Sequence, residues 1–444
     1  MKLLSFSPVR SILLSYIALI LLGTVSFKFL PLTRSELSFV DALFTATSAV
    51  TVTGLTVISI PEGLTFPGEI FLLFLIQVGG LGYMTITTFF LITLRRKIGL
   101  KERMTLAEAL DYPGLYGLVR FLRRVVVFVL IVESLGTLIL GLYWSFFSPI
   151  ERPFFMALFH SVSAFNNAGF TIIPGGLEAF RGDVVVNLTF VLLVVLGGLG
   201  FFVINELYLF FRRKVSRVST HTKLVVLSSF LLTALGWLGL ILTELFHYKG
   251  LWSMGWDDRV LASLFLSVSS RTAGFSTVDL SLLSESSLFL IMLLMFIGAS
   301  PGGTGGGIKT TTFAVILLAV ASYVRGKDEV VVFHRRVSHR HIYRAMVIMS
   351  LSVAYISAIN LLIDRIEEKD FLKTIFEVVS AFSTVGLSVG EGGLSFCAGF
   401  SDIGKLLIIL SMLIGRVGIL SFAIALIGRE EKSAVEHPEA RLLL

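Results

Sequence analysis

Long apolar stretches alternate with short polar segments along the chain, and eight of these stretches are long enough to cross a membrane. About 20 apolar residues in a helix match the hydrocarbon thickness of a bilayer. The stretches lie at 11–31, 68–94, 122–147, 184–211, 223–246, 286–324, 343–363 and 403–428. The pattern therefore predicts an all-α polytopic membrane protein with eight spans.

Four shorter apolar pieces lie between each odd-numbered span and the even-numbered span that follows it. They cover residues 38–50, 154–166, 258–270 and 370–383. A piece of this length is too short to cross the bilayer, so we interpret each one as a re-entrant half-helix. Each runs into a glycine that is followed by a bulky apolar residue: Gly54, Gly169, Gly274 and Gly386. The unit is thus helix, half-helix, glycine loop, helix.

This unit recurs four times, because the four glycines are between 105 and 115 residues apart. A second glycine landmark follows each of them after 24 to 29 residues, at Gly79, Gly197, Gly298 and Gly415. Two glycines that keep nearly the same spacing in four successive units indicate internal repetition. We expect four pseudo-symmetric repeats around one central pore, with the boundaries 1–112, 113–218, 219–330 and 331–444.

Composition agrees with a membrane location and argues against a soluble protein. The 444 residues are 55% hydrophobic and only 15% charged, and the mean hydropathy is +0.89. The net charge of +7 does not indicate nucleic-acid binding, because the basic residues gather in the loops after even-numbered spans, including Arg95, Arg96 and Lys97. The positive-inside bias predicts that both termini are cytoplasmic and that the glycine loops lie near the outside of the cell membrane.

The four glycine loops are the candidate functional site. Glycine tolerates positive φ and lets carbonyl groups approach a ligand, and rings of carbonyls replace the water shell of potassium in channel filters. The candidate potassium ligands are the carbonyls of Val52, Thr53, Gly54, Asn167, Ala168, Gly169, Thr272, Ala273, Gly274, Thr384, Val385 and Gly386. Helix-packing glycines are the competing interpretation, but four glycines in phase favour the ring.

Acidic residues near the starts of the half-helices can act in two ways. They are Asp41, Asp257, Asp258 and Asp370. A carboxylate there can cap the helix, and it can also attract cations. We favour capping for each of them.

A glycine-rich segment, residues 298–309, interrupts the sixth span and is the candidate gate. It resembles a phosphate-binding loop, but that motif requires glycine directly before the lysine, and Ile308 stands there instead. Irregular backbone at membrane depth must be buried in protein or line a cavity. We expect the segment below the filter, as a gate or as a passive kink. The candidate gating residues are Gly302, Gly303, Thr304, Gly305, Gly306, Gly307, Lys309 and Arg416.

Arg416 is a charge within the last span, where it needs a partner or a wet cavity. It can act as an electrostatic barrier below the filter or as a structural group that bonds carbonyls. Other polar residues in the apolar segments have simpler interpretations. Arg271 braces its loop, His160 and Glu377 are scaffold groups, and Asn205 with Glu206 is interfacial.

The sequence contains no motif that points to catalysis. It lacks paired acids in a plausible cleft, a His/Cys metal spacing and a nucleophile motif, and Cys397 is its single cysteine. We therefore expect neither an enzyme nor a bound cofactor.

Several of these segments together resemble the Trk/Ktr/HKT superfamily of potassium transporters. Residues 45–55, 160–170, 267–275 and 376–387 are similar to its four filter segments. Residues 298–312 are similar to its intramembrane gating loop, and 415–418 to its pore arginine segment. Within the superfamily, the chain is most similar to Ktr membrane subunits of the KtrB type, because it starts directly at the first repeat.

This resemblance implies sodium-stimulated potassium uptake by a homodimer in which each protomer has its own pore. It also implies a cytosolic ring of KtrA-like nucleotide-binding regulatory subunits. Val52 and Asn166 stand where the family often has cysteine, but only side chains differ, so the carbonyl ring is kept. A sodium-translocating or proton-coupled transporter on the same scaffold is the alternative, and a non-transport membrane scaffold or enzyme is a third.

Overall fold

Helices make up nearly all of the regular structure. The computed structural model describes residues 8–82, 99–109, 116–148, 150–245, 247, 250–390 and 392–427. In this part of the chain, the one sheet is a hairpin of β1 (Val331–Val332) and β2 (Arg335–Arg336). The prediction of a mostly helical protein is confirmed. Arg95, Arg96 and Lys97, which support the predicted orientation, and the predicted repeat boundary between 112 and 113 lie outside the described residues, as do residues 1–7 and 428–444.

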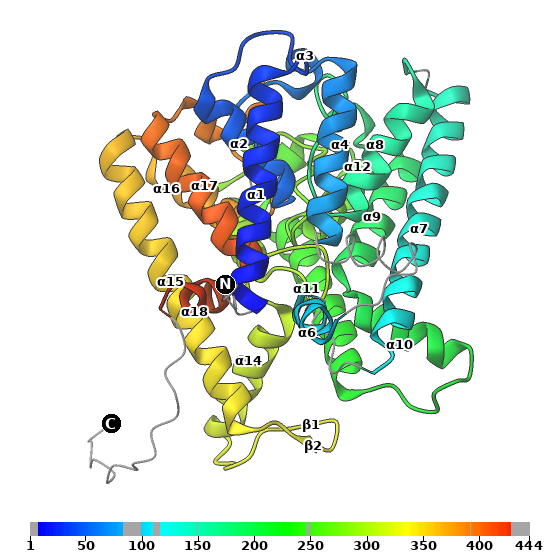
Figure 1. The fold of residues 1–444 in the computed structure, drawn as a ribbon, viewed down its shortest axis with the longest axis vertical. Coiled ribbons are helices and arrows are strands. Elements are labelled where there is room, and N and C mark those ends of the chain that lie inside the picture. Colours follow the sequence, from blue (N-terminus) through cyan, green and yellow to red (C-terminus); the bar gives the residue numbers. More distant parts are fainter. Residues whose placement is uncertain are drawn as a thin grey trace.

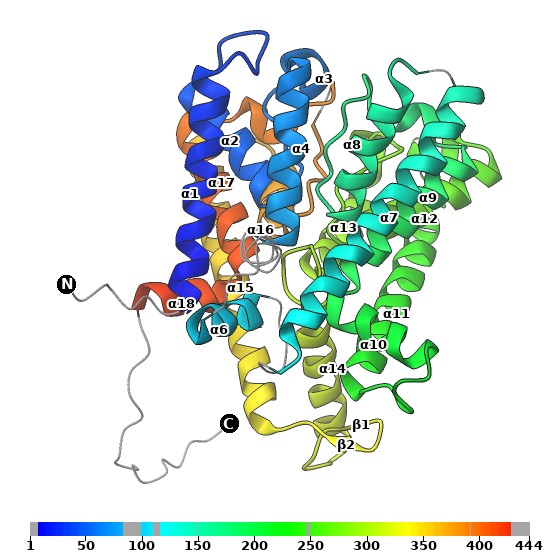
Figure 2. The ribbon, with the colours of Figure 1, turned by 45° about the vertical axis from the view of Figure 1, so that its right-hand side comes forward.

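Four helices among the described residues are long and apolar enough to cross a membrane alone. They are α1 (Pro8–Phe29), α7 (Leu118–Phe146), α11 (Thr220–Thr243) and α15 (His339–Glu367). Figures 1 and 2 show α1, α7 and α15 at the periphery, along the long axis of the molecule. Large apolar side chains such as Leu21, Leu135 and Leu361 are more than 49% exposed on these helices. Such surfaces suit contact with lipid.

The four predicted half-helices are present and are short. They are α2 (Phe39–Val50), α8 (Pro153–Phe165), α12 (Trp256–Ser269) and α16 (Phe371–Ser383). Each packs against the long helix that precedes it in the chain. Their last turns are buried, so the carbonyl ends of all four helices point into the bundle.

In three of the four repeats, the second span is divided into two helices, and in the first repeat the described residues hold one helix of it. The segments are α4 (Phe66–Leu81), α9 (Val184–Gly198) with α10 (Phe201–Phe211), α13 (Glu285–Phe296) with α14 (Thr310–Val324), and α17 (Asp402–Val417) with α18 (Ile419–Ile427). The predicted interruption after α13 is confirmed. The predicted spans at 184–211 and 403–428 are each two helices that meet at a bend of 100°. Figure 2 shows α18 across the lower ends of α1 and α17.

Glycines with positive φ lie at the two bends, after α9 and after α17, and a third follows the end of α4. Gly82, Gly200 and Gly418 have φ values of 80°, 92° and 87°, with ψ between 129° and 133°. Residues with a side chain rarely adopt this conformation, so the helix ends there. If each bent pair is one span, the described residues contain up to six spans. The count of eight stays a prediction.

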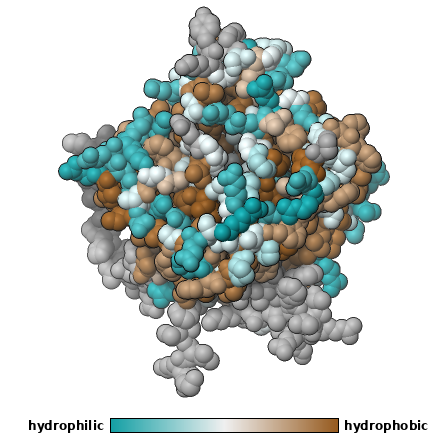
Figure 3. Space-filling view, turned by 90° about the horizontal axis from the view of Figure 1, so that it is seen from above, coloured by the Kyte–Doolittle hydropathy of each residue, from teal (hydrophilic) through white to brown (hydrophobic). Residues whose placement is uncertain are grey.

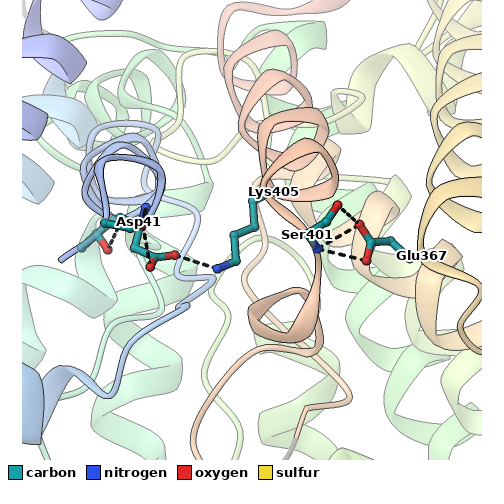
Figure 4. A network of polar contacts seen from close by, with 6 residues as sticks. Asp41, Glu367, Ser401 and Lys405 are labelled. Carbon is teal, nitrogen blue, oxygen red and sulfur yellow. Dashed lines mark hydrogen bonds and ion pairs between the residues drawn. The ribbon is translucent and has the colours of Figure 1, made fainter.

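The ends of the helices nearest α3 (Ile60–Gly63) are tied together by polar contacts. Lys405 Nζ lies 2.7 Å from Asp41 Oδ1, and Ser401 donates to Glu367 (Figure 4). Capping by Asp370 is confirmed, because its carboxylate accepts from the backbone N–H of Lys373. Capping is wrong for the other three acids: Ser38 caps α2, and Gly255 occupies the N-cap of α12.

Short elements complete the described structure. They are α6 (Leu100–Ala109), η1 (Glu178–Phe180), η2 (Gly250–Ser253), η3 (Leu280–Leu282) and η4 (Phe396–Gly399). The β1–β2 hairpin lies at the opposite end of the molecule from α3 (Figure 1).

Candidate functional site: a ring of four glycine loops

The loops that follow the four half-helices meet in a closed ring in the interior. A Cβ atom added to any of the four glycines would meet a carbonyl oxygen of the neighbouring loop. These oxygens are Ala168 O for Gly54 (2.6 Å), Ala273 O for Gly169 (3.0 Å), Val385 O for Gly274 (2.2 Å) and Thr53 O for Gly386 (2.1 Å). The four glycines therefore converge, as the sequence predicts, and packing this close requires glycine at each position.

The four loops have the same backbone conformation. The glycines have φ values from 71° to 95°, and the residues two positions earlier also have positive φ: Val52, Asn167, Thr272 and Thr384, from 50° to 86°. Positive φ is uncommon for residues other than glycine and is strained for β-branched ones. Its recurrence at corresponding positions indicates that the surrounding structure imposes one turn on all four loops.

A serine supports each loop, and the sequence analysis missed all four. Ser48 and Ser380 accept from the backbone N–H groups of Gly54 and Gly386, both at 3.1 Å. Ser163 donates to the carbonyl of Phe170 at 2.9 Å, and Ser269 donates to that of Phe275. The sequence contains the pattern that could have identified them. A serine precedes the ring glycine by six residues in the first, second and fourth repeats, and by five residues in the third repeat.

The second glycine landmark has a packing role. A Cβ at Gly79, Gly197 or Gly415 would lie 1.7–2.1 Å from a carbonyl oxygen at the end of its repeat's half-helix. These oxygens belong to Val50, Phe165 and Phe382. Gly298 differs, since its nearest neighbour is Gly306 O, within its own glycine-rich segment. The interruption of the third repeat thus replaces a contact that the other three repeats share.

The ring presents oxygen atoms and the negative ends of four helix dipoles, and both favour a cation. Backbone carbonyls can replace the water shell of a monovalent cation without charged ligands. Among the described residues, no group of three His, Cys, Asp or Glu side chains could hold a metal ion. The chemistry available at the ring is therefore coordination by neutral oxygen atoms.

One side of the ring opens into a cavity of about 470 Å³ that we call the acidic mouth. The four glycines line it together with residues after them, and its carboxylates are Glu62, Glu178 and Asp279. Glu178 is exposed, yet partial desolvation and the nearby Asp279 carboxylate raise its pKa above 4.5. Figure 3 shows this end of the molecule, where hydrophilic side chains gather over the face between hydrophobic ones.

The other side of the ring faces a smaller cavity of about 290 Å³ that we call the basic cavity. Lys309, Arg344 and Arg416 line it, together with Gly302, Gly303, Gly305 and Gly307 of the glycine-rich segment. The two cavities therefore differ in the sign of their side-chain charges.

The glycine-rich segment lies directly against the ring, inside the bundle, as expected. Gly306 N donates to Thr384 Oγ1 at 2.9 Å, and a Cβ at Gly305 would lie 2.2 Å from Thr272 Oγ1. Its other bonds reach the second repeat, because Thr304 N donates to Gly197 O at 3.2 Å. Lys309 Nζ donates back to Gly305 O at 2.9 Å. The segment is thus packed between two repeats and immediately beside the candidate ligands.

Arg416 joins three parts of the chain below the ring. Its guanidinium donates to the carbonyls of Thr304 in the glycine-rich segment and of Gly79 and Gly80 at the end of α4. Its Nε donates to the hydroxyl of Tyr16 at 3.2 Å. The structural interpretation, in which Arg416 bonds carbonyls, is confirmed. Its action as an electrostatic barrier stays a prediction.

The remaining polar residues from the sequence analysis are scaffold groups. Arg271 donates to the carbonyl of Ser229 on α11 at 2.9 Å, which confirms its bracing role. His160 contacts Met156 O and Thr171 Oγ1, and Glu377 accepts from Ser388 and from Cys397 N. In α10, Asn205 accepts from Arg124, and Glu206 accepts from Ser219, which precedes α11.

The sequence analysis also missed Glu133, which is buried in α7 and contacts Asn166 directly before the second candidate filter segment. An ionisable residue within an apolar span is itself a signal of function. Glu133 carried the same sequence signal as Arg416, a charged residue within an apolar span.

Comparison with known proteins places this geometry in a family. A family described as "TrkH: Cation transport protein" matches residues 10–436. Two relatives extend over nearly the whole chain. The Ktr system potassium uptake protein B of Bacillus subtilis is 36% identical and covers 99% of this chain and 97% of its own. The potassium/sodium uptake protein NtpJ of Enterococcus hirae is 32% identical, with coverage of 99% and 97%.

One solved structure supports the fold. The crystal structure of the potassium transporter TrkH from Vibrio parahaemolyticus superposes with a TM-score of 0.74. The superposition covers 96% of this chain and 86% of the other, at 21% sequence identity. At that identity, the likeness shows a shared fold.

Proposed function

Because this chain belongs to the TrkH family of cation transport proteins, we propose that it takes up potassium across the cell membrane through the ring of glycine loops. It is a multi-pass membrane transport protein, as its family and its several apolar helices show. Relatives that are named for potassium uptake, and that align over nearly the full length of the chain, support potassium as the transported ion.

The observation that carries the proposal is the closed ring of carbonyl oxygens. Thr53, Ala168, Ala273 and Val385 each place a carbonyl oxygen against the glycine of the next loop. In the proposal, these carbonyls and those of the neighbouring filter residues replace the water shell of potassium. The ring requires no ionised ligand, which suits a monovalent cation that must bind and leave quickly.

The gate, in this proposal, is the glycine-rich segment held by Arg416. Its contacts with Thr272 and Thr384 support this role, because both residues are candidate ligands. The way the segment is held also supports a gating role. The side chains of Arg416 and Lys309 donate hydrogen bonds to its backbone carbonyls. Side-chain contacts of this kind can exchange without unfolding a helix.

The proposed architecture has four repeats with the boundaries 1–112, 113–218, 219–330 and 331–444, which together make eight spans. The acidic mouth faces outward and both termini face the cytoplasm. The chain works as a homodimer on a cytosolic ring of KtrA-like nucleotide-binding regulatory subunits. Relatives that are named as parts of a Ktr system support a partner of this kind.

Sodium enters the proposal in two ways. Sodium-stimulated potassium uptake is the leading form. The second candidate is sodium translocation, or coupling to protons, on the same scaffold. A relative named for both potassium and sodium uptake, which is 32% identical over 99% of this chain, favours testing sodium as a transported ion.

Uptake of rubidium, a potassium mimic, into proteoliposomes tests the function. We expect saturable uptake that sodium stimulates and that Gly274→Ser strongly reduces, because any side chain at position 274 meets Val385 O. Sodium flux without preference for rubidium would favour the second candidate. Absence of flux for either ion, in protein that is folded and inserted, would overturn the proposal.

A further inference from the structure

A carboxyl group is buried behind the second filter segment, beside helices that carry no lysine or arginine. Glu133 lies in the middle of α7 and is 5% exposed. Helices α4, α8 and α9, which surround this part of α7, contain no lysine or arginine. A charge at membrane depth is costly, so its presence requires a compensating arrangement.

Two amide side chains provide that arrangement. Glu133 Oε1 accepts from Asn166 Nδ2, and Glu133 Oε2 accepts from Gln77 Nε2, both at 3.2 Å. Asn166 Nδ2 also lies 2.8 Å from Gln77 Oε1, so the three groups form one cluster from α7, α8 and α4. Both carboxyl oxygens act as acceptors, which is the pattern of a carboxylate.

The cluster reaches the filter through Asn166. Asn166 is the C-cap of α8, and the next two residues, Asn167 and Ala168, are candidate potassium ligands. On its other side, Asn166 packs so tightly on Gly80 that a Cβ there would lie 2.0 Å from Asn166 Oδ1. The backbone at Asn166 therefore has little freedom while the cluster is intact.

The position that Asn166 occupies is supported differently in the other repeats. The residues three positions before the four ring glycines are Thr51, Asn166, Arg271 and Ser383. Asn166 and Arg271 both reach the first helix of their own repeat. Thr51 instead bonds to Thr47 O on its own half-helix and to Thr53 Oγ1 in its own loop. The second loop is the one in which a carboxylate holds the residue before the candidate ligands, whereas in the fourth loop Glu377 accepts from Ser388, after the ring glycine.

We propose that Glu133 is a positioning residue that determines ion specificity, because it holds the second filter segment through Asn166 and Gln77. Discrimination between potassium and sodium depends on where the four carbonyl groups stand. Release of one segment lets its carbonyls approach a smaller ion, and the preference for potassium falls. This inference rests on the proposed function of the ring as a potassium filter.

The test is the ratio of rubidium to sodium uptake in proteoliposomes that contain the full chain. Glu133→Gln keeps the size of the side chain and removes one of the two acceptors. We expect the ratio to fall about tenfold, the size of effect that loss of a hydrogen bond to a charged group produces. Asn166→Ser, which removes the other end of the contact, should lower the ratio in the same direction.

Glu244→Gln is the matched control. Glu244 is also fully buried and accepts from Ser284 and Ser287, but it holds the start of α13 and not a filter loop. We expect this variant to lower the melting temperature and leave the ratio unchanged. An effect on the ratio as large as that of Glu133→Gln would show that any buried defect alters selectivity, and the proposal would fail.

A double variant separates positioning from general damage. Because Glu133 acts through Asn166, the double variant should lose no more selectivity than the stronger single variant. The proposal is overturned if the Glu133 and Asn166 variants both transport with the wild-type ratio, or if their effects add fully. Lack of rubidium uptake by the wild-type protein would instead refute the proposed function, so the two failures can be told apart.

Discussion

The acidic mouth and the basic cavity lie on two sides of one ring, and they are built differently. Glu62, Glu178 and Asp279 line the mouth, whereas Lys309, Arg344 and Arg416 line the cavity. Carboxylates concentrate cations at an entrance, and fixed positive charges raise the barrier to cations behind it. In a protein that takes up cations, this asymmetry suits entry through the mouth and control at the cavity.

The kind of contact differs as well as the charge. Where the mouth meets the ring, the backbone of one loop packs on the backbone of the next. In the cavity, the side chains of Arg416 and Lys309 hold the glycine-rich segment. The backbone packing between ring loops is either intact or lost as a whole. The side-chain contacts in the cavity can be broken one at a time. Substitutions should therefore act abruptly at the ring and gradually in the cavity.

The largest effect is expected from alanine at the ring glycines. A Cβ at Gly386 or Gly274 would lie 2.1 or 2.2 Å from a backbone oxygen, and at Gly169 it would lie 3.0 Å away. Strain at positive φ costs on the order of 1–3 kcal/mol even without a clash. We expect Gly386→Ala and Gly274→Ala to reduce rubidium uptake about 100-fold or more, and Gly169→Ala to reduce it less.

Gly326→Ala is the control for the glycine series. Gly326 has a similar φ of 65°, but a Cβ there would meet nothing within 4 Å. It should transport almost normally. An effect of Gly169→Ala as large as that of Gly386→Ala would contradict the graded contact distances.

The second effect concerns the cavity. Arg416→Gln removes the donors that hold Thr304 of the glycine-rich segment and the end of α4. If these contacts keep the gate closed, rubidium flux should rise about tenfold, the equivalent of 1.4 kcal/mol. The measurement is the initial rate of uptake at saturating rubidium, normalised to inserted protein. A folded variant with unchanged or reduced flux would argue that Arg416 is a scaffold group only.

A smaller effect is expected at the mouth. Glu178→Gln removes one of its negative charges, so the KM for rubidium should rise about threefold at low ionic strength and less at high ionic strength. The maximal rate should not change, because the ring is untouched. If KM is insensitive to salt in both proteins, the mouth does not concentrate cations.

The same residue predicts a pH dependence. Desolvation and Asp279 raise the pKa of Glu178, so its carboxylate takes up a proton at a higher pH than the ordinary value of 4.5. As pH falls through that raised value, the mouth loses a negative charge and KM should rise. The rise should be absent from Glu178→Gln. Identical KM profiles for the two proteins would show that another group is responsible.

The smallest effect is expected away from both cavities. Lys405→Met breaks the ion pair with Asp41 that joins α17 to α2 (Figure 4). The side chains are 12% and 23% exposed, and such pairs contribute about 0.5–1 kcal/mol. The melting temperature in detergent should fall slightly, with rubidium selectivity unchanged. A change in selectivity would extend the coupling from this end of α17 to the ring.

The half-helices and the ring glycines could be predicted from the sequence, because each depends on residues close together in the chain. The apolar periods predicted the four half-helices to within about two residues, and the phased glycines predicted the ring. The bends at Gly200 and Gly418 were missed, because an apolar run looks the same whether its helix is straight or broken. The supporting serines were missed because Ser, Thr and Ala are common throughout these segments.

The sequence by itself determined the membrane class, the fourfold repetition and the places where only glycine fits, because each of these follows from spacing and composition along the chain. Tertiary structure decided which groups meet. Arg416 bonds carbonyls more than 300 residues earlier in the chain, and Glu133 finds its amide partners on two other helices. Such pairings depend on how the helices pack in three dimensions, and no local pattern encodes them.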